Sequence, residues 1–356
     1  APHGTDKDDD SGEIGEKGVG LTFVIYMSNL YQIATRTTTS AARGQMAGAA
    51  AWKNGAVEDR PLFDYEDEVG TFSPDETFTE IDLGDVEALA TEEGDLFQQP
   101  VEVIAYWLRA KTAVGEVNSV FEPGKEPAFL VSLAYVDAAG TGSEHEIRPS
   151  YVLPQDFISS KDVVRVDQAF YEKMAGFNES QKNNYLQGKA LIKTSEVFRA
   201  GRFIKYYCFV APSRDLWTKI SQAQGLVTKE DGSERNLFEG SITTATKGMP
   251  TGIDLTPPST GYAGYWPNFF ILMQDNALKF DLGRKSLPGR TTGLLRDVAK
   301  DIFNELHKLL RYVGEATGAV IPGPGDKWER DKMLEELQKL PDLGSESSNF
   351  LKQPSG

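Results

Sequence analysis

The sequence predicts an α/β protein built from α+β two-layer sandwiches, and three observations support this class. Segments in which apolar and polar residues alternate, as in strands, interleave with segments of helical periodicity. Clusters of glycine and proline separate these segments. The length of 356 residues exceeds the size at which a single core stops growing, so two domains and a tail are expected.

The composition excludes several classes of protein. Hydrophobic residues make up 40% of the chain and charged residues 25%, which is typical of a soluble globular protein. A net charge of −16 discourages association with nucleic acid or an anionic membrane. The single cysteine, Cys208, allows no internal disulfide, and three scattered histidines offer no zinc-ligand spacing. We therefore expect a cytoplasmic protein with no metal ligands of its own.

The first hundred residues contain two segments that alternate like strands, at 31–37 and 77–83. An apolar segment at 19–29 precedes the first of them, and a small-residue segment at 43–54 ends in the turn signal Asn54-Gly55. The acidic stretch 58–76 carries two prolines, so it is expected to be mostly surface loop. An α/β layer follows from this pattern.

The remainder of the chain continues the alternation of helices and strands. Strands are expected at 129–136 and 203–211, and helices at 101–108, 214–222 and 292–313. The last helix has the clearest periodicity, with apolar residues at steps of three or four. Thr291 or Thr292 is expected to cap its start, and Gly314 to end it. A proline- and glycine-rich breaker then precedes a short amphipathic segment and a polar tail.

A glycine-rich turn near the amino terminus has the chemistry of a phosphate site. Glycines immediately before a helix leave backbone N–H groups unpaired where the helix dipole also favours negative charge. The turn comprises Gly15, Glu16, Lys17, Gly18, Val19, Gly20 and Leu21. The alternative is an ordinary tight turn between two elements.

The run 14–25, together with the strand that ends in Thr35-Arg36-Thr37, resembles the ATPase superfamily of gyrase, heat-shock chaperones, histidine kinases and mismatch-repair proteins, which has the Bergerat fold. The segment 77–83 looks like the strand that completes that family's sheet. The resemblance implies that ATP is the ligand. It also implies that the phosphates contact Gly15, Glu16, Lys17, Gly18, Val19, Gly20 and Leu21.

The chain also departs from this family. The helix that carries the family's general base and magnesium-binding asparagine is missing, and so is the Asp-x-Gly-x-Gly adenine motif. The Mg²⁺ ligand is therefore expected outside this chain, on a missing N-terminal ATPase segment or a longer parent chain. By this resemblance residues 1–98 are the C-terminal half of an ATPase domain, 99–318 a transducer-like domain and 319–356 a linker, helix and tail.

A transducer of this family inserts a basic residue against the terminal phosphate. The segment 244–252 is similar to the family's lysine loop, which makes Lys247 one candidate sensor. Arg284 and Lys285 are the other candidates, and both loops can instead be solvated turns. The segment 261–269 resembles uncharacterised prokaryotic members.

Three functions follow as hypotheses. The first is an ATP-binding conformational switch within an ATP-hydrolysing machine, and this machine can be a homodimer. The second is a degenerate, non-catalytic scaffold or protein-interaction module, which the missing base and metal ligand favour. The third is a component of a nucleic-acid-processing ATPase, which the net charge argues against.

Overall fold

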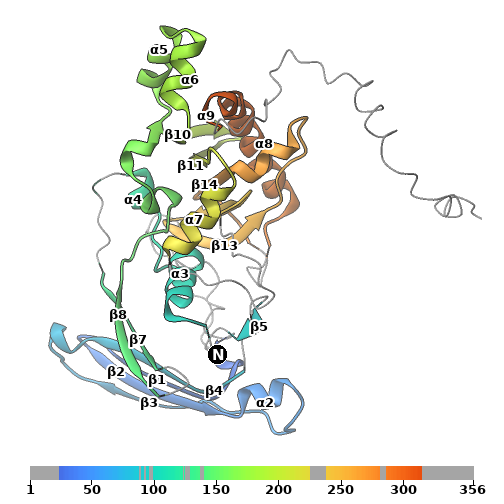
Figure 1. Ribbon diagram of the computed structural model, residues 1–356. Coiled ribbons are helices and arrows are strands. Elements are labelled where there is room, and N and C mark those ends of the chain that lie inside the picture. Colours follow the sequence, from blue (N-terminus) through green and yellow to red (C-terminus); the bar gives the residue numbers. More distant parts are fainter. Residues whose placement is uncertain are drawn as a thin grey trace, which may run out of the picture.

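The structure, a computed structural model, combines helices with two main β-sheets of four and six strands, which confirms the mixed α/β class (Figure 1). The remaining strands of the described part of the chain form two hairpins. The residues that the structure describes are 24–87, 90–91, 94–95, 99–122, 124, 129–136, 140–224, 238–280 and 286–314.

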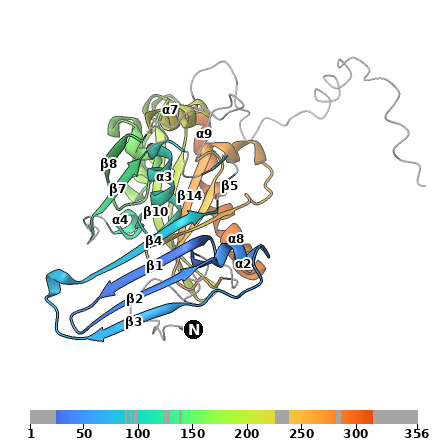
Figure 2. The same cartoon turned by 90° about the horizontal axis from the view of Figure 1, so that it is seen from below.

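The four-stranded sheet is antiparallel throughout and has the order β3-β2-β1-β4. Its strands are β1 (Ser28–Arg36), β2 (Ser40–Ala47), β3 (Asp64–Val69) and β4 (Phe78–Val86). The short helix α2 (Ala49–Lys53) follows β2, and the 3-10 turn η1 (Pro74–Glu76) precedes β4. The sheet extends to one side of the rest of the molecule, as the views in Figures 1 and 2 agree.

The strands expected at 31–37 and 77–83 are confirmed as β1 and β4. The loop expected over 58–76 is wrong in part, because it contains the edge strand β3. All six residues of β3 are exposed. A strand that buries neither face needs no alternation of apolar and polar residues, so its sequence carried no strand signal.

The six-stranded sheet has the order β13-β12-β14-β11-β10-β9. Neighbouring strands are antiparallel except for β9 with β10 and β12 with β14. Its strands are β9 (Val163–Arg165), β10 (Ala190–Arg199), β11 (Arg202–Val210), β12 (Ile242–Thr246), β13 (Met249–Leu255) and β14 (Phe269–Asp275).

Helices and short turns surround this sheet. The helices are α3 (Val101–Lys111), α4 (Asn118–Phe121), α5 (Gln168–Ala175), α6 (Glu179–Leu186), α7 (Asp215–Ala223), α8 (Gly289–Leu306) and α9 (Leu310–Val313). The 3-10 turns are η3 (Pro154–Phe157), η4 (Ser160–Asp162), η5 (Ala263–Asn268) and η6 (His307–Leu309). The hairpins pair β5 (Ala90–Thr91) with β6 (Gly94–Asp95) and β7 (Val131–Val136) with β8 (Gly142–Ile147).

Both faces of the six-stranded sheet are buried, each in its own core. Strand β14 shows this most clearly, because all seven of its residues are buried. Ile271 and Met273 belong to the core that includes α8, whereas Phe270 and Leu272 belong to the core that includes Trp217 of α7. A strand covered on both faces reads as a continuous apolar run, which is the pattern of this segment.

The C-terminal helix differs from its expected form at the start. Helix α8 begins at Gly289, with Pro288 as its N-cap, so the predicted cap at Thr291 or Thr292 is wrong. The backbone N–H groups of both threonines instead donate to the carbonyl of Pro288. The predicted end at Gly314 is confirmed, although η6 interrupts the helix before α9.

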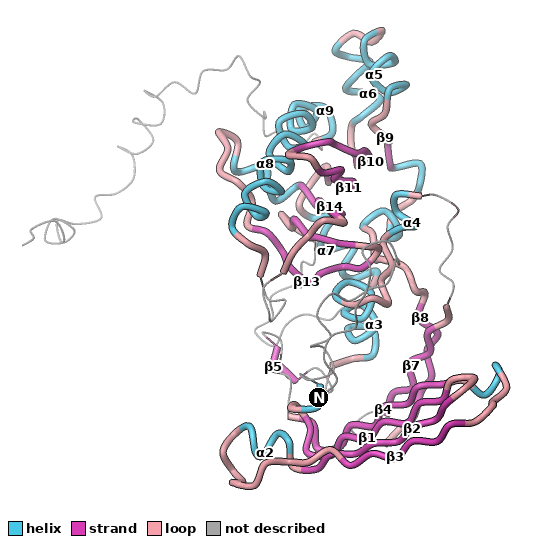
Figure 3. The backbone as a smooth tube through the Cα atoms, turned by 180° about the vertical axis from the view of Figure 1, so that it is seen from behind, coloured by secondary structure: helices cyan, strands magenta, loops and turns pink. Residues whose placement is uncertain are grey.

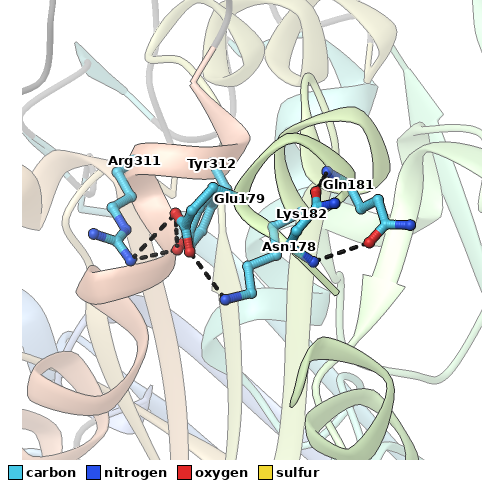
Figure 4. Close-up of polar contacts among 6 residues, drawn as sticks. All are labelled: Asn178, Glu179, Gln181, Lys182, Arg311 and Tyr312. Atoms are coloured by element: carbon cyan, nitrogen blue, oxygen red, sulfur yellow. Dashed lines mark hydrogen bonds and ion pairs between the residues drawn. The ribbon is translucent and has the colours of Figure 1, made fainter. Parts of the chain in front are cut away.

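Helices α5 and α6 form a pair at one end of the molecule, and a polar cluster joins this pair to α9 (Figures 1 and 4). The carboxylate of Glu179 accepts hydrogen bonds from Lys182 Nζ at 3.0 Å and from the Tyr312 hydroxyl at 2.8 Å. Arg311 lies beside the same carboxylate at 3.8 Å. Asn178 caps α6 immediately before Glu179. The N-cap and the carboxylate that contacts α9 therefore lie together at the N-terminus of α6.

Candidate functional site

Most of the residues that the resemblance implicates lie outside the described residues. Gly15, Glu16, Lys17, Gly18, Val19, Gly20 and Leu21 fall in this group, and so do Arg284 and Lys285. Lys247 is described, and the structure places it at the turn between β12 and β13. Its phosphate-sensing role stays a prediction.

Lys247 and Gly248 form the two-residue turn of the β12–β13 hairpin. Their φ angles are 48° and 82°, and a turn with two positive φ angles matches the twist of a hairpin. The backbone N–H of Lys247 donates to Asn276 Oδ1 at 2.8 Å. The carbonyl of Gly248 accepts the N–H of Val117 at 2.9 Å. The turn is therefore held rigidly from two sides.

Neutral amide side chains surround this turn. Gln274 Nε2 donates to Asn276 Oδ1 at 3.1 Å, and a Cβ on Gly248 would lie 2.4 Å from Asn118 Nδ2. Gln274 is only 4% exposed, and its Oε1 has no partner within the described part of the chain. Side-chain amides do not ionise near neutral pH, so this arrangement positions the backbone of Lys247 and offers no acid or base group.

The four-stranded sheet presents two unlike faces. The register aligns Tyr65, Gly44, Ile33 and Ile81 in one row across the four strands. Residues opposite one another in a ladder share a face, and every second residue along each strand joins them. We call this the apolar face, and its large apolar residues are Tyr31, Ile33, Met46, Tyr65, Val69, Ile81 and Leu83.

The opposite face, which we call the polar face, is acidic. The row next to the apolar one aligns Glu66, Arg43, Ala34 and Glu80. Five carboxylates and two arginines lie on this face: Asp64, Glu66, Glu68, Glu80, Asp82, Arg36 and Arg43. Among the paired strand residues, the apolar face carries one carboxylate, Asp67.

The apolar face is exposed along its two edge strands, β3 and β4, whereas Tyr31 of the central strand β1 is only 1% exposed. The side chains of Tyr65 and Val69 are 69% and 89% exposed, and those of Ile81 and Leu83 are 43% and 41% exposed. The two hydrophobic cores contain no residue from the four strands of this sheet. Figure 3 shows the hairpin β7–β8 leading from the body to the sheet. Large exposed apolar residues on one side of a sheet are candidates for an interaction site.

Sequence reasoning missed these apolar side chains as functional residues. The alternation in 31–37 and 77–83 predicted strands, each with one apolar face. Alternation records which residues share a face, but it does not distinguish burial inside the chain from burial against another molecule. The acidic residues of 58–76, interpreted as a loop, were the available signal for an exposed edge.

A second polar cluster joins α8 to α5 and β10 through Glu305. Glu305 of α8 accepts hydrogen bonds from Lys193 of β10 and the Tyr171 hydroxyl. Burial, reinforced by the Glu305 charge, raises the pKa of neighbouring Tyr206 to about 12. Burial also raises the pKa of the Cys208 thiol well above its ordinary value. Groups so reluctant to ionise at neutral pH are poor bases and nucleophiles, so the cluster is structural.

The described residues contain no metal-ligand cluster and no helix that could span a membrane. Within those residues no three histidine, cysteine or acidic side chains come close enough to hold a metal ion. No helix in the described part has the length and apolar character to cross a membrane. Neither a family model nor a curated protein matches the chain.

Proposed function

We propose that this chain is a non-catalytic protein-interaction module whose contact surface is the apolar face of the four-stranded sheet. The observation that carries the proposal is the exposure of Tyr65, Val69, Ile81 and Leu83 on one face of a sheet that contributes to neither core. An antiparallel sheet normally packs one face on a core. Here that face remains for another protein.

The charge of the chain supports a protein partner over nucleic acid or lipid. The net charge is −16, and the polar face of the same sheet carries five carboxylates against two arginines. Phosphate-rich ligands are repelled by such a surface. An uncharged protein surface has no such penalty, and burial of apolar side chains drives its association.

The proposal is tested in cells that carry the natural gene. We expect the native-size complex, measured by gel filtration of fresh extract, to shift to monomer size when Ile81→Asp and Leu83→Asp are introduced together. The matched control is Glu80→Gln with Asp82→Asn, which alters the same strand on its polar face. A wild-type chain that already elutes at monomer size would contradict the proposal.

A second candidate function is the ATP-linked switch, in which Lys247 senses the terminal phosphate. The specific observation in its favour is that Asn276 fixes the backbone of Lys247 at the β12–β13 turn, which limits the positions that its side chain can reach. ATP and Mg²⁺ are the proposed ligands.

Calorimetry with a non-hydrolysable ATP analogue and Mg²⁺ tests this candidate. Lys247→Asn is the informative variant, because asparagine tolerates the positive φ of the turn while the cation is removed. Weaker binding by the variant than by the wild type supports the switch. Equal binding removes Lys247 from the site, and absence of binding by both removes the ATP proposal for this chain.

A further inference from the structure

We infer that the free edge of strand β3 binds an extended, basic segment of another protein, which extends the four-stranded sheet by one strand. The inference goes beyond the proposed function, because it concerns the edge of the sheet and not its apolar face. Three features of β3 carry it: its outward-facing backbone groups, its regularity and its charge.

Strand β3 lies at the end of the strand order, with β2 as its only neighbour in the sheet. Figure 2 shows β3 on the side of the sheet that faces away from the rest of the molecule. Among the described residues, none outside β2 pairs with β3 through the backbone, and all six residues of β3 are exposed. Such an edge carries N–H and C=O groups to which another strand can bind.

The ladder between β2 and β3 identifies which backbone groups face outward. In an antiparallel ladder, residue pairs that exchange hydrogen bonds alternate with pairs that exchange none. The N–H of Gly70 donates to the carbonyl of Thr39 at 3.1 Å, in continuation of the register of the two strands. Alternation back along β3 from this bonded pair assigns the outward-facing backbone groups to Tyr65, Asp67 and Val69.

The strand is regular along its whole length. It pairs with β2 over six consecutive residue pairs without a shift, and it contains no proline. Proline, bulges and very short strands are common devices by which natural sheets prevent an edge from pairing. Strand β3 has none of these devices, so its backbone can accept another strand, and its charges decide which kind.

The charges of β3 select a basic strand. Four of its six residues are acidic and none is basic. A second copy of β3 would place carboxylates opposite carboxylates, which destabilises a strand pair, whereas lysine or arginine would form favourable cross-strand pairs. Glu66 and Glu68 lie on the polar face of the sheet. Tyr65 and Val69 lie on the apolar face. The segment that fits best therefore alternates basic and apolar residues.

Fluorescence anisotropy on the purified full chain tests the inference. The probe is a labelled peptide of about seven residues in which lysine and valine alternate. We expect half-saturation below about 100 μM at low salt, and binding at least about fivefold weaker in about 0.5 M salt, because exposed ion pairs are screened. A peptide of alternating glutamate and valine should bind at least about 10-fold more weakly. Equal binding of the two peptides, or no binding of the first, overturns the inference.

Methylated peptides test the backbone pairing. In an antiparallel ladder, the residues that bond to the outward groups of β3 lie directly opposite them, on the apolar side, and are the valines. N-methylation of the valines should therefore weaken binding at least about 10-fold, whereas N-methylation of the lysines should change it less than about twofold. Equal affinities of the two methylated peptides would show that the contact does not use the backbone, and would overturn the inference.

Variants of the chain locate the site on β3. Asp67→Pro removes an outward N–H and keeps the bonds to β2, so circular dichroism should be unchanged while binding weakens at least about 10-fold. Its control, Asp67→Asn, keeps the N–H and should lose less than about threefold. Glu66→Gln with Glu68→Gln should weaken binding at least about fivefold. Glu80→Gln with Asp82→Asn, on the opposite edge strand β4, should change it less than about twofold. Equal losses in the β3 and β4 variants contradict the site.

The outcomes for this site and for the proposed function can be distinguished. If the peptide does not bind but the cellular complex still depends on Ile81 and Leu83, this inference fails and the proposed function survives. If the peptide binds as expected and the wild-type chain in fresh extract elutes at monomer size, the proposed function fails and the edge site remains.

Discussion

Arg202, at the start of β11, donates to the carboxylate of Asp275, the last residue of β14, across 3.1 Å. The two side chains differ in exposure, because Asp275 is 1% exposed and Arg202 is 28% exposed. Asp275 also accepts the backbone N–H of Ala277 at 2.9 Å. The arginine therefore neutralises a buried charge at the end of a central strand.

Removal of that arginine should destabilise the protein. We expect Arg202→Ala to lower the free energy of unfolding by about 2 kcal/mol, because the buried carboxylate of Asp275 loses its partner. Urea denaturation followed by circular dichroism measures the change. Arg199→Ala, on the same hairpin, is the matched control: Arg199 pairs with Asp301 in the open, where an ion pair contributes less than about 1 kcal/mol. Equal losses in both variants would refute the explanation.

The buried thiol should report global unfolding. Cys208 is fully buried, and burial raises the pKa of its thiol, so the native protein holds almost no thiolate at pH 8. We expect a thiol reagent to label it only as fast as the chain unfolds, and at the ordinary rate in urea. Rapid labelling of the folded protein would contradict the burial of Cys208.

Stability should fall at high pH through Tyr206. The pKa of this side chain is raised to about 12 in the folded state by burial and then by the Glu305 charge, whereas an unfolded tyrosine titrates near 10. Between these values the folded state binds more protons than the unfolded state, so the stability declines as the pH rises from about 10 to about 12. Tyr206→Phe should make that decline less steep in urea titrations.

Tyr65→Phe serves as the control for that experiment, because Tyr65 is 69% exposed. We expect it to leave the slope of stability against pH unchanged. A Tyr206→Phe slope as steep as that of the wild type would show that Tyr206 does not carry the effect.

The β12–β13 turn should accept asparagine but not alanine. Gly248→Ala places a Cβ 2.4 Å from Asn118 Nδ2 in a residue with a φ of 82°, so we expect a loss of about 2 kcal/mol in thermal or urea unfolding. Lys247 has a φ of 48°, which asparagine tolerates, so Lys247→Asn should change stability by less than about 0.5 kcal/mol. A harmless Gly248→Ala would contradict the turn geometry.

Those elements of the fold could be predicted whose apolar residues recur at the period of a strand or a helix. The alternation of 31–37 and 77–83 identified β1 and β4, and the 3.6-residue period of 292–313 identified α8. Strand β3 was not predicted, because neither of its faces is buried and its sequence does not alternate. The N-cap of α8 was predicted at the wrong residue, because Pro288 and not a threonine precedes its first turn. The predicted phosphate turn lies outside the described residues, so it stays a prediction.

The sequence by itself determined which residues share a face, because side chains alternate along a strand whatever the strand packs against. It therefore already grouped Ile81 with Leu83 and separated them from Glu80 and Asp82. Tertiary contacts, by contrast, cover both faces of the six-stranded sheet with helices and leave the edge strands of the apolar face exposed. That outcome depends on contacts between residues far apart in the chain, which no local pattern specifies.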